Sequence, residues 1–236
     1  MTILGIETAT LVEGLALLDE SGVVASSVRR VKKGHAEHLL PTLERMLSDV
    51  HLSTGHLDAI AVSIGPGSFT GLRIGLSTAK GLCFAEGIPL IAVPTLEALA
   101  SRAPFCHLPV CPMLDARKKE VYTALYDTSR GDVQVRMDPR AISPKAFLNA
   151  LSGPVLFLGE GATVYRDLIL EILGERAYFV PPELFQPWAP AVARLGLARL
   201  RRGEIADLRE TEPLYLRKSE AELTEEVARR RRSLGM

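Results

Sequence analysis

The segment GPGSFTGLRIG, residues 65–75, decides the fold of this chain. The apolar run at residues 59–64 precedes it and has the composition of a buried strand. The small and apolar residues that follow predict a helix from Thr70 to Glu86. The chain therefore passes from a strand through a tight glycine turn into a helix. Such a turn directs backbone N–H groups out of the end of a sheet, where they favour an anion or an acidic group of a partner.

This segment does not match the familiar glycine-rich or nucleophile motifs. A P-loop ends in Gly-Lys followed by Ser or Thr, whereas Gly71 is followed by Leu72 and Arg73. A dinucleotide fingerprint needs a third glycine where this chain has Thr70. A nucleophile elbow is absent, because no glycine stands two residues after Ser68. On spacing alone, a tight turn without a ligand explains the segment equally well.

The composition of the chain limits the classes of protein to which it can belong. Apolar residues make up 47% of the 236 positions, which is enough for a sizeable core. The 28 basic and 28 acidic side chains cancel, which argues against an autonomous nucleic-acid binder and leaves only a local basic patch open. Cys83, Cys106 and Cys111 form no Cys-x-x-Cys pair, as is typical of reduced structural thiols. With no secretory or membrane-spanning pattern, we expect a cytoplasmic protein.

The first hundred residues predict a three-stranded antiparallel meander followed by alternating helices and strands. The Ser21-Gly22 pair is expected to turn the chain between the second and third strands. This order is that of the ribonuclease-H-like lobes of the actin and sugar-kinase superfamily, which is an argument about fold alone. The expected strands are residues 2–10, 15–19, 23–28, 59–64 and 88–93, and the expected helices are residues 36–50, 70–86 and 96–102.

Two of these helices carry a face suited to close packing. Helix 36–50 has a single apolar stripe, and helix 70–86 has small residues at steps of four. Each glycine costs about 1 kcal/mol in a helix interior, so a close approach is expected to offset it. Packing on the protein's own sheet and packing against another subunit explain the small residues equally well. The apolar stripe comprises Leu39, Leu40, Leu43, Met46, Leu47 and Val50, and the small residues are Gly71, Gly75 and Ala79.

A proline-punctuated stretch at residues 103–109 is the expected domain boundary. It divides the chain into a first lobe of residues 1–102, a second lobe of residues 103–218 and a polar, basic tail of residues 219–236. The second lobe again begins with strands, which indicates a degenerate duplication of the first. Its expected strands are residues 110–115, 120–126, 133–137, 155–159 and 177–180, and its expected helices are residues 163–173 and 190–202.

Four segments together resemble the TsaB (YeaZ) family. They are residues 65–75, 88–99, 115–122 and 213–217, and they follow the family's order between residue 2 and about residue 222. The first is highly specific and the others support it. The resemblance implies an α/β protein with two actin-like lobes of ribonuclease-H type. It also implies a bacterial protein required to form threonylcarbamoyladenosine at position 37 of tRNAs that read ANN codons.

The resemblance further implies that this chain is not the catalytic subunit. The similar catalytic protein TsaD holds its metal with two histidines, at the positions of Thr95 and Leu99 here. Other ATPases of the fold have an aspartate in the first turn, where this chain has Glu7. We therefore expect no metal and no cofactor. The expected lining of a cleft between the lobes is Glu7, Thr8, Asp115, Arg117 and Glu120, although the last three also suit an exposed hairpin loop.

The partners that the resemblance implies are TsaD and the ATPase TsaE, with tRNA reached only through the complex and no membrane involved. TsaD is expected to bind helices 36–50 and 70–86, and without TsaD the same faces are expected to form a homodimer. The expected interface residues are Leu39, Leu43, Met46, Leu47, Gly71, Leu72, Gly75, Ala79 and Leu82. The motif residues of the glycine segment are Gly65, Pro66, Gly67, Ser68, Phe69, Thr70 and Arg73.

Three alternatives stay open. The first is an ATPase or phosphotransferase that uses the same cleft. The second is a metal-dependent peptidase with His35, Glu37 and His38 as ligands, although a third ligand of suitable spacing is not evident and a capping role is favoured. The third is direct tRNA binding through Arg229–Arg232, for which a solvated tail is the better explanation.

Overall fold

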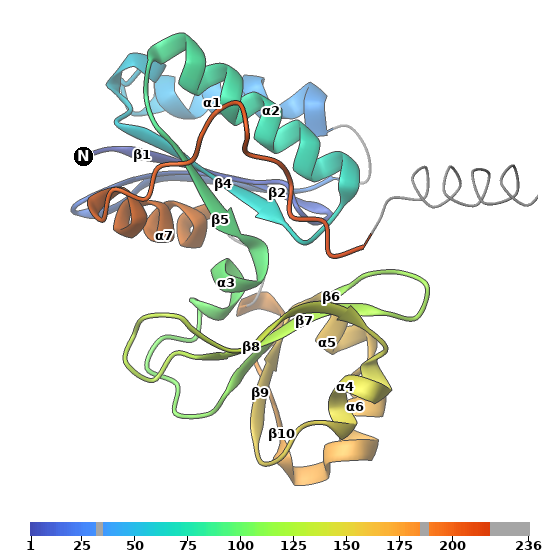
Figure 1. Cartoon of the computed structure of the whole chain (residues 1–236). Helices are drawn as coiled ribbons and strands as arrows, with labels where there is room; N and C mark the ends of the chain where they lie inside the picture. Colours follow the sequence, from blue (N-terminus) through green and yellow to red (C-terminus); the bar gives the residue numbers. More distant parts are fainter. Residues whose placement is uncertain (32–34, 185–188, 218–236) are drawn as a thin grey trace, which may run out of the picture.

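The computed structural model describes residues 1–31, 35–184 and 189–217. The chain forms two lobes, each built on a mixed five-stranded sheet (Figure 1). The first sheet has the order β3-β2-β1-β4-β5. Its strands are β1 (Ile3–Glu7), β2 (Val12–Asp19), β3 (Gly22–Arg30), β4 (Ala59–Gly65) and β5 (Leu90–Pro94).

The predicted meander is confirmed. Strands β1, β2 and β3 pair antiparallel; Glu20 and Ser21 form the turn between β2 and β3, and Gly22, with a φ of 132°, begins β3. Strands β4 and β5 join β1 in parallel. On one face lie α1 (His35–Asp49) and α2 (Phe69–Glu86), and the short η1 (Thr54–His56) precedes β4.

The opposite face of the first sheet is covered by α7 (Ala189–Arg201) (Figure 1). Close packing requires glycine on both sides of this contact. A Cβ on Gly5 would lie 2.5 Å from the carbonyl oxygen of Ala189, and a Cβ on Gly196 would lie 2.3 Å from the Cβ of Ala61. The helix was expected at residues 190–202 as part of the second lobe, and that assignment is wrong, because its apolar side packs on β1, β2 and β4.

The second sheet, of order β10-β9-β6-β7-β8, repeats the pairing pattern of the first, with three antiparallel strands and two parallel ones. The expected helix at residues 163–173 is divided at Tyr165, and one helix, α4, was not predicted. The elements are β6 (Val110–Asp115), β7 (Val121–Asp127), β8 (Gln134–Ile142), α4 (Pro144–Asn149), β9 (Val155–Leu158), α5 (Glu160–Val164), α6 (Arg166–Leu173), η2 (Gly174–Arg176), β10 (Ala177–Phe179) and η3 (Pro182–Leu184).

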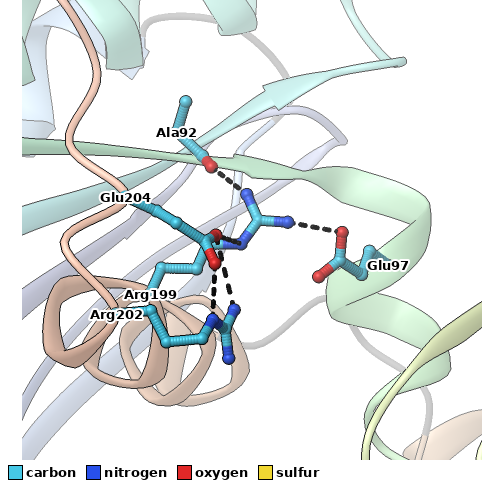
Figure 2. A network of polar contacts seen from close by, with 5 residues as sticks. All are labelled: Ala92, Glu97, Arg199, Arg202 and Glu204. Carbon is cyan, nitrogen blue, oxygen red and sulfur yellow. Dashed lines mark hydrogen bonds and ion pairs between the residues drawn. The ribbon is translucent and has the colours of Figure 1, made fainter.

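The lobes are joined where α3 (Thr95–Ala100) leaves the first sheet beside α7. Figure 2 shows Arg199 of α7 at this crossing. Its guanidinium donates to the carbonyl oxygen of Ala92 and to the carboxylate of Glu97, the latter at 2.7 Å, and lies 3.9 Å from the carboxylate of Glu204. Because β5 is an edge strand, Arg199 supplies the partner that the Ala92 carbonyl lacks in the sheet. This network ties α7 to the end of β5 and to α3.

After α7 the chain runs back along the first lobe. The N–H of Ala206 donates to the carbonyl oxygen of Leu90, and the N–H of Leu214 donates to that of Ile64. The described part of the chain then ends beside the turn between β6 and β7 (Figure 1). Within the described ranges, none of the helices has the length and apolar character needed to span a bilayer. The two-lobed α/β fold with a duplicated strand order, and shorter helices in its second half, is thus as predicted.

Candidate functional site

A cleft of about 460 Å³ lies between the lobes. The first lobe contributes the turn after β1 and the glycine segment before α2. The second lobe contributes the end of β6, the turn that follows it, and the start of α5. The lining residues are Ala9, Thr10, Leu11, Gly67, Ser68, Phe69, Leu114, Asp115, Ala116, Arg117, Tyr122, Glu160, Tyr215 and Arg217.

Two residues expected in this lining, Glu7 and Thr8, lie behind it, and both are fully buried. The carboxylate of Glu7 accepts hydrogen bonds from the N–H of Ala9, at 2.6 Å, and from the hydroxyl of Ser63. The hydroxyl of Thr8 donates to the carbonyl oxygen of Gly71 at 2.8 Å. The prediction is therefore corrected: these side chains connect β1 to β4 and α2, and they do not face the cleft.

The glycine segment is a structural junction. Ser68 is the N-cap of α2, and its Oγ accepts the N–H of Gly71 at 3.3 Å. The N–H of Ser68 donates to the carbonyl oxygen of Ala9 at 2.6 Å. A Cβ on Gly67 would lie 2.3 Å from that same oxygen, so only glycine fits there. These donors are used inside the protein rather than directed at an anion.

The rest of the motif divides between core and surface. Gly65 and Pro66 are buried, whereas Phe69, Thr70 and Arg73 are exposed on the first turns of α2. The motif therefore anchors the start of the helix and presents an aromatic ring and a guanidinium to solvent.

The small residues of α2 pack on the protein's own sheet. A Cβ on Gly71 would lie 2.0 Å from the carbonyl oxygen of Thr8, and one on Gly75 would lie 2.2 Å from its Oγ1. Ala79 is fully buried in the core of the first lobe. Of the two explanations that the sequence left open, packing within the lobe is the correct one.

The apolar stripe of α1 likewise points inward. Leu39, Leu43, Met46 and Leu47 belong to the same core cluster, Leu72 of α2 is fully buried, and Leu82 packs partly buried against the cluster. The expected interface residues are thus core residues, because the apolar side of an amphipathic helix covers its own sheet first. The outward side of the two helices carries other side chains, among them Leu40 at 45% exposure and Phe84 at 84%.

The second lobe supplies most of the charged side chains that line the cleft. The carboxylate of Asp115 accepts the N–H of Arg117 at 2.9 Å and pairs with its guanidinium at 3.3 Å. Burial raises the pKa of the Glu160 carboxyl, and the negative charge of Asp115 raises it further, while Arg117 and Arg30 oppose the effect. Asp115 and Arg117 line the cleft as predicted, and Glu120 lies just outside it, paired with Arg217.

Sequence reasoning missed the role of residues 213–217. The ring of Tyr215 stacks on Phe69 with 5.1 Å between centroids, and its hydroxyl accepts a hydrogen bond from Nε of Arg73 at 3.0 Å. The Arg73 guanidinium also lies 3.9 Å from the centroid of Phe69. The resemblance marked this segment as characteristic, but nothing in the sequence pairs residues so far apart.

The two positions that the resemblance aligns with the metal-binding histidines of TsaD are buried. Thr95 and Leu99 are fully buried, and Leu99 packs in a cluster with Val110 of β6 and Tyr126 of β7. Among the residues that the structure describes, no three His, Cys, Asp or Glu side chains gather as metal ligands would. The side chain of His35 and the run Arg229–Arg232 lie outside the described part. The structure therefore does not test the peptidase alternative or direct tRNA binding through the tail.

The comparisons with known proteins agree over nearly the whole chain. The family described as "TsaD: tRNA N6-adenosine threonylcarbamoyltransferase" matches residues 21–225. TsaB of Bacillus subtilis is 34% identical over 94% of this chain and 96% of its own, and TsaB of Escherichia coli is 29% identical with the same coverage. The solved structure of YeaZ from Pseudomonas aeruginosa aligns with a TM-score of 0.78 and 29% identity, over 91% of this chain and 99% of that one. The chain therefore belongs to the TsaB (YeaZ) family.

Proposed function

We propose that this protein acts in the biosynthesis of tRNA threonylcarbamoyladenosine as a non-catalytic subunit that pairs with TsaD and, through the pair, with TsaE. The names of its relatives support the pathway. The observation that carries the non-catalytic role is the complete burial of Thr95 and Leu99 on α3, where Leu99 packs against the second sheet. Neither side chain offers an imidazole, and neither position opens onto the cleft. In this role the protein reaches tRNA only through the complex and acts in the cytoplasm.

The first turn of the chain supports the same conclusion. An ATPase needs a carboxylate or a similar group that reaches the nucleotide and its metal. The carboxylate of Glu7 is fully buried and held by Ser63 and Ala9. The isolated chain is therefore not expected to hydrolyse ATP or to transfer its phosphate.

The surface proposed for TsaD is the outward side of α1 and α2, which lie next to each other on one face of the first sheet (Figure 1). Phe84 is the most exposed large apolar side chain described, and burying a side chain of this size contributes about 1.5–3 kcal/mol. Exposed Ser77 and Gly81 precede it on α2, and a Cβ on Gly81 would meet no atom within 4 Å. The small side chains at positions 77 and 81 would let a partner helix come close, and in the absence of TsaD this surface would accept a second copy of the chain.

Reconstitution with the cognate TsaD, TsaE, tRNA and threonylcarbamoyl-adenylate as the donor tests the proposal. Threonylcarbamoyl transfer to adenosine 37 should require this chain together with TsaD, and this chain alone should neither modify tRNA nor turn over Mg-ATP. Transfer by TsaD and TsaE at the full rate without this chain would contradict the subunit role. ATP turnover by the isolated chain would favour the phosphotransferase or ATPase alternative.

A further inference from the structure

We propose that residues 213–217, here called the latch, tie the two lobes together across the mouth of the cleft, so that releasing the latch opens the cleft. The inference concerns motion within this chain and does not depend on the proposed partner. It follows from where the two ends of this short segment are bound.

The latch is held on the first lobe by three contacts. The N–H of Leu214 donates to the carbonyl oxygen of Ile64 at the end of β4, at 2.7 Å. Tyr215 stacks on Phe69 and accepts the hydrogen bond of Arg73, both on the first turns of α2. A Cβ on Gly65 would lie 2.7 Å from the carbonyl oxygen of Leu214, so the glycine segment leaves room for the latch to lie against it.

On the second lobe the latch is held by one side chain. The guanidinium of Arg217 donates to the carbonyl oxygen of Ala116 and to the carboxylate of Glu120, both at 3.3 Å. These two residues flank the turn after β6, in which Arg117, Lys118 and Lys119 have φ values of 62°, 51° and 62°. Left-handed conformations cost non-glycine residues about 1–2 kcal/mol each, so this turn needs contacts that hold it, and Arg217 supplies two of them.

The latch is too short to follow a large separation of the two lobes. Leu214 and Arg217 are three residues apart, and three residues span at most about 11 Å when fully extended. The lobes are also joined by α3, whose Leu96 and Leu99 pack with Val110 of the second sheet and whose Glu97 pairs with Arg199 of α7 (Figure 2). Because the lobes are joined at α3 and again at Arg217, the cleft cannot widen far unless the contacts of Arg217 break.

The contacts of Arg217 with the second lobe are weak enough to break and re-form. The side chains of Arg217 and Glu120 are 25% and 36% exposed, and ion pairs near the surface are only marginally stabilising and are screened by salt. Opening therefore loses one partly exposed ion pair and one hydrogen bond, and leaves the cores of both lobes intact.

The test is the distance between the lobes in the full-length chain. Spin labels are attached at exposed Ser26→Cys on β3 and exposed Lys145→Cys on α4, away from the proposed partner surface, in a Cys106→Ser background, since the remaining thiols, Cys83 and Cys111, are buried. The labelled chain is diluted with unlabelled chain so that only distances within one molecule are measured. Pulsed electron paramagnetic resonance then compares the parent with Arg217→Ala, Glu120→Gln and the control Arg136→Ala. The control removes an ion pair to Asp127 that lies within the second lobe.

Both latch variants should lengthen and broaden the distance distribution, while the control leaves it unchanged. In Arg217→Ala, the amide of Leu214 should also exchange with solvent about fivefold faster, as expected for the loss of one surface ion pair. Should Arg217→Ala fail to fold by circular dichroism, Glu120→Gln decides alone. A distribution unchanged in the latch variants, or changed equally in the control, would overturn the proposal.

Discussion

The hydroxyl of Ser63 on β4 donates a hydrogen bond to the carboxylate of Glu7 at the end of β1, and both residues are fully buried. The same carboxylate accepts the N–H of Ala9. The side chain that stands where ATPases of this fold carry an aspartate is thereby bound between two parallel strands. It stabilises the turn after β1 and does not reach the cleft.

Ser63→Ala should destabilise the protein, because it removes a donor from a buried carboxylate. The free energy of unfolding should fall by about 1–3 kcal/mol. Ser26→Ala provides the control, since Ser26 is an exposed residue of β3 and its loss should change stability by less than about 0.5 kcal/mol. Urea unfolding of both variants measures the difference. Equal stabilities would mean that the Glu7 carboxylate does not depend on Ser63.

Gly75→Ala and Gly81→Ala should change stability in opposite directions, although both glycines lie inside α2. The added methyl at position 75 would lie 2.2 Å from Oγ1 of Thr8, whereas at position 81 it meets nothing within 4 Å. Overpacking should cost about 1–3 kcal/mol in the first variant, and higher helix propensity should add up to about 1 kcal/mol in the second.

Thermal unfolding checks these two glycine variants. A lower transition temperature for Gly81→Ala than for Gly75→Ala would show that the inward side of α2 is wrongly assigned. The larger change Gly75→Arg is expected to disrupt the first lobe, because Thr8 leaves no space for a side chain at position 75.

Glu160→Gln should stabilise the protein at neutral pH. Burial and the charge of Asp115 raise the pKa of this carboxyl in the folded state, so the folded protein holds its proton more tightly than the unfolded chain. The carboxylate therefore destabilises the fold above its folded pKa, and this penalty disappears as the pH falls below the usual glutamate value. The transition temperature of the variant should exceed that of the parent at pH 7 and match it near pH 3. A variant less stable than the parent at pH 7 would contradict this assignment.

Phe84→Ala should weaken the complex with TsaD without destabilising this chain, because the ring is 84% exposed and contributes little to the core. A loss of about tenfold in affinity, or ~1.4 kcal/mol, is expected. Phe105→Ala is the matched control: that ring is 69% exposed but lies on the connection to the second lobe. Titration calorimetry with TsaD measures both variants, and equal effects would argue against the α1–α2 surface.

Local patterns were enough to predict the order of strands and α-helices in the first lobe, whereas α4 was not predicted and α5 and α6 were expected as one helix. The turn before β3, the apolar run of β4 and the helix that follows the glycine segment each follow from neighbouring residues, and each is present. Helix α7 was assigned to the wrong lobe, because an amphipathic pattern shows that a helix covers a sheet but not which sheet.

The candidate site was harder to predict, because local patterns do not show which distant residues a segment packs against. Periodicity correctly grouped Gly71 with Gly75, but what they pack against, the turn at Thr8, is set by tertiary structure. The stacking of Tyr215 on Phe69 joins two distant parts of the sequence and has no local signal. Asp115 and Arg117 line the cleft, where the resemblance placed them, although their spacing alone slightly favoured an exposed hairpin loop.

The central claim, that this chain is a partner subunit of TsaD, is tested most directly by size-exclusion chromatography with light scattering. The chain is run alone and then mixed with its cognate TsaD. We predict a homodimer that converts to a heterodimer when TsaD is added, since both are proposed to use the outward side of α1 and α2. A chain whose mass and elution are unaffected by TsaD would contradict the claim.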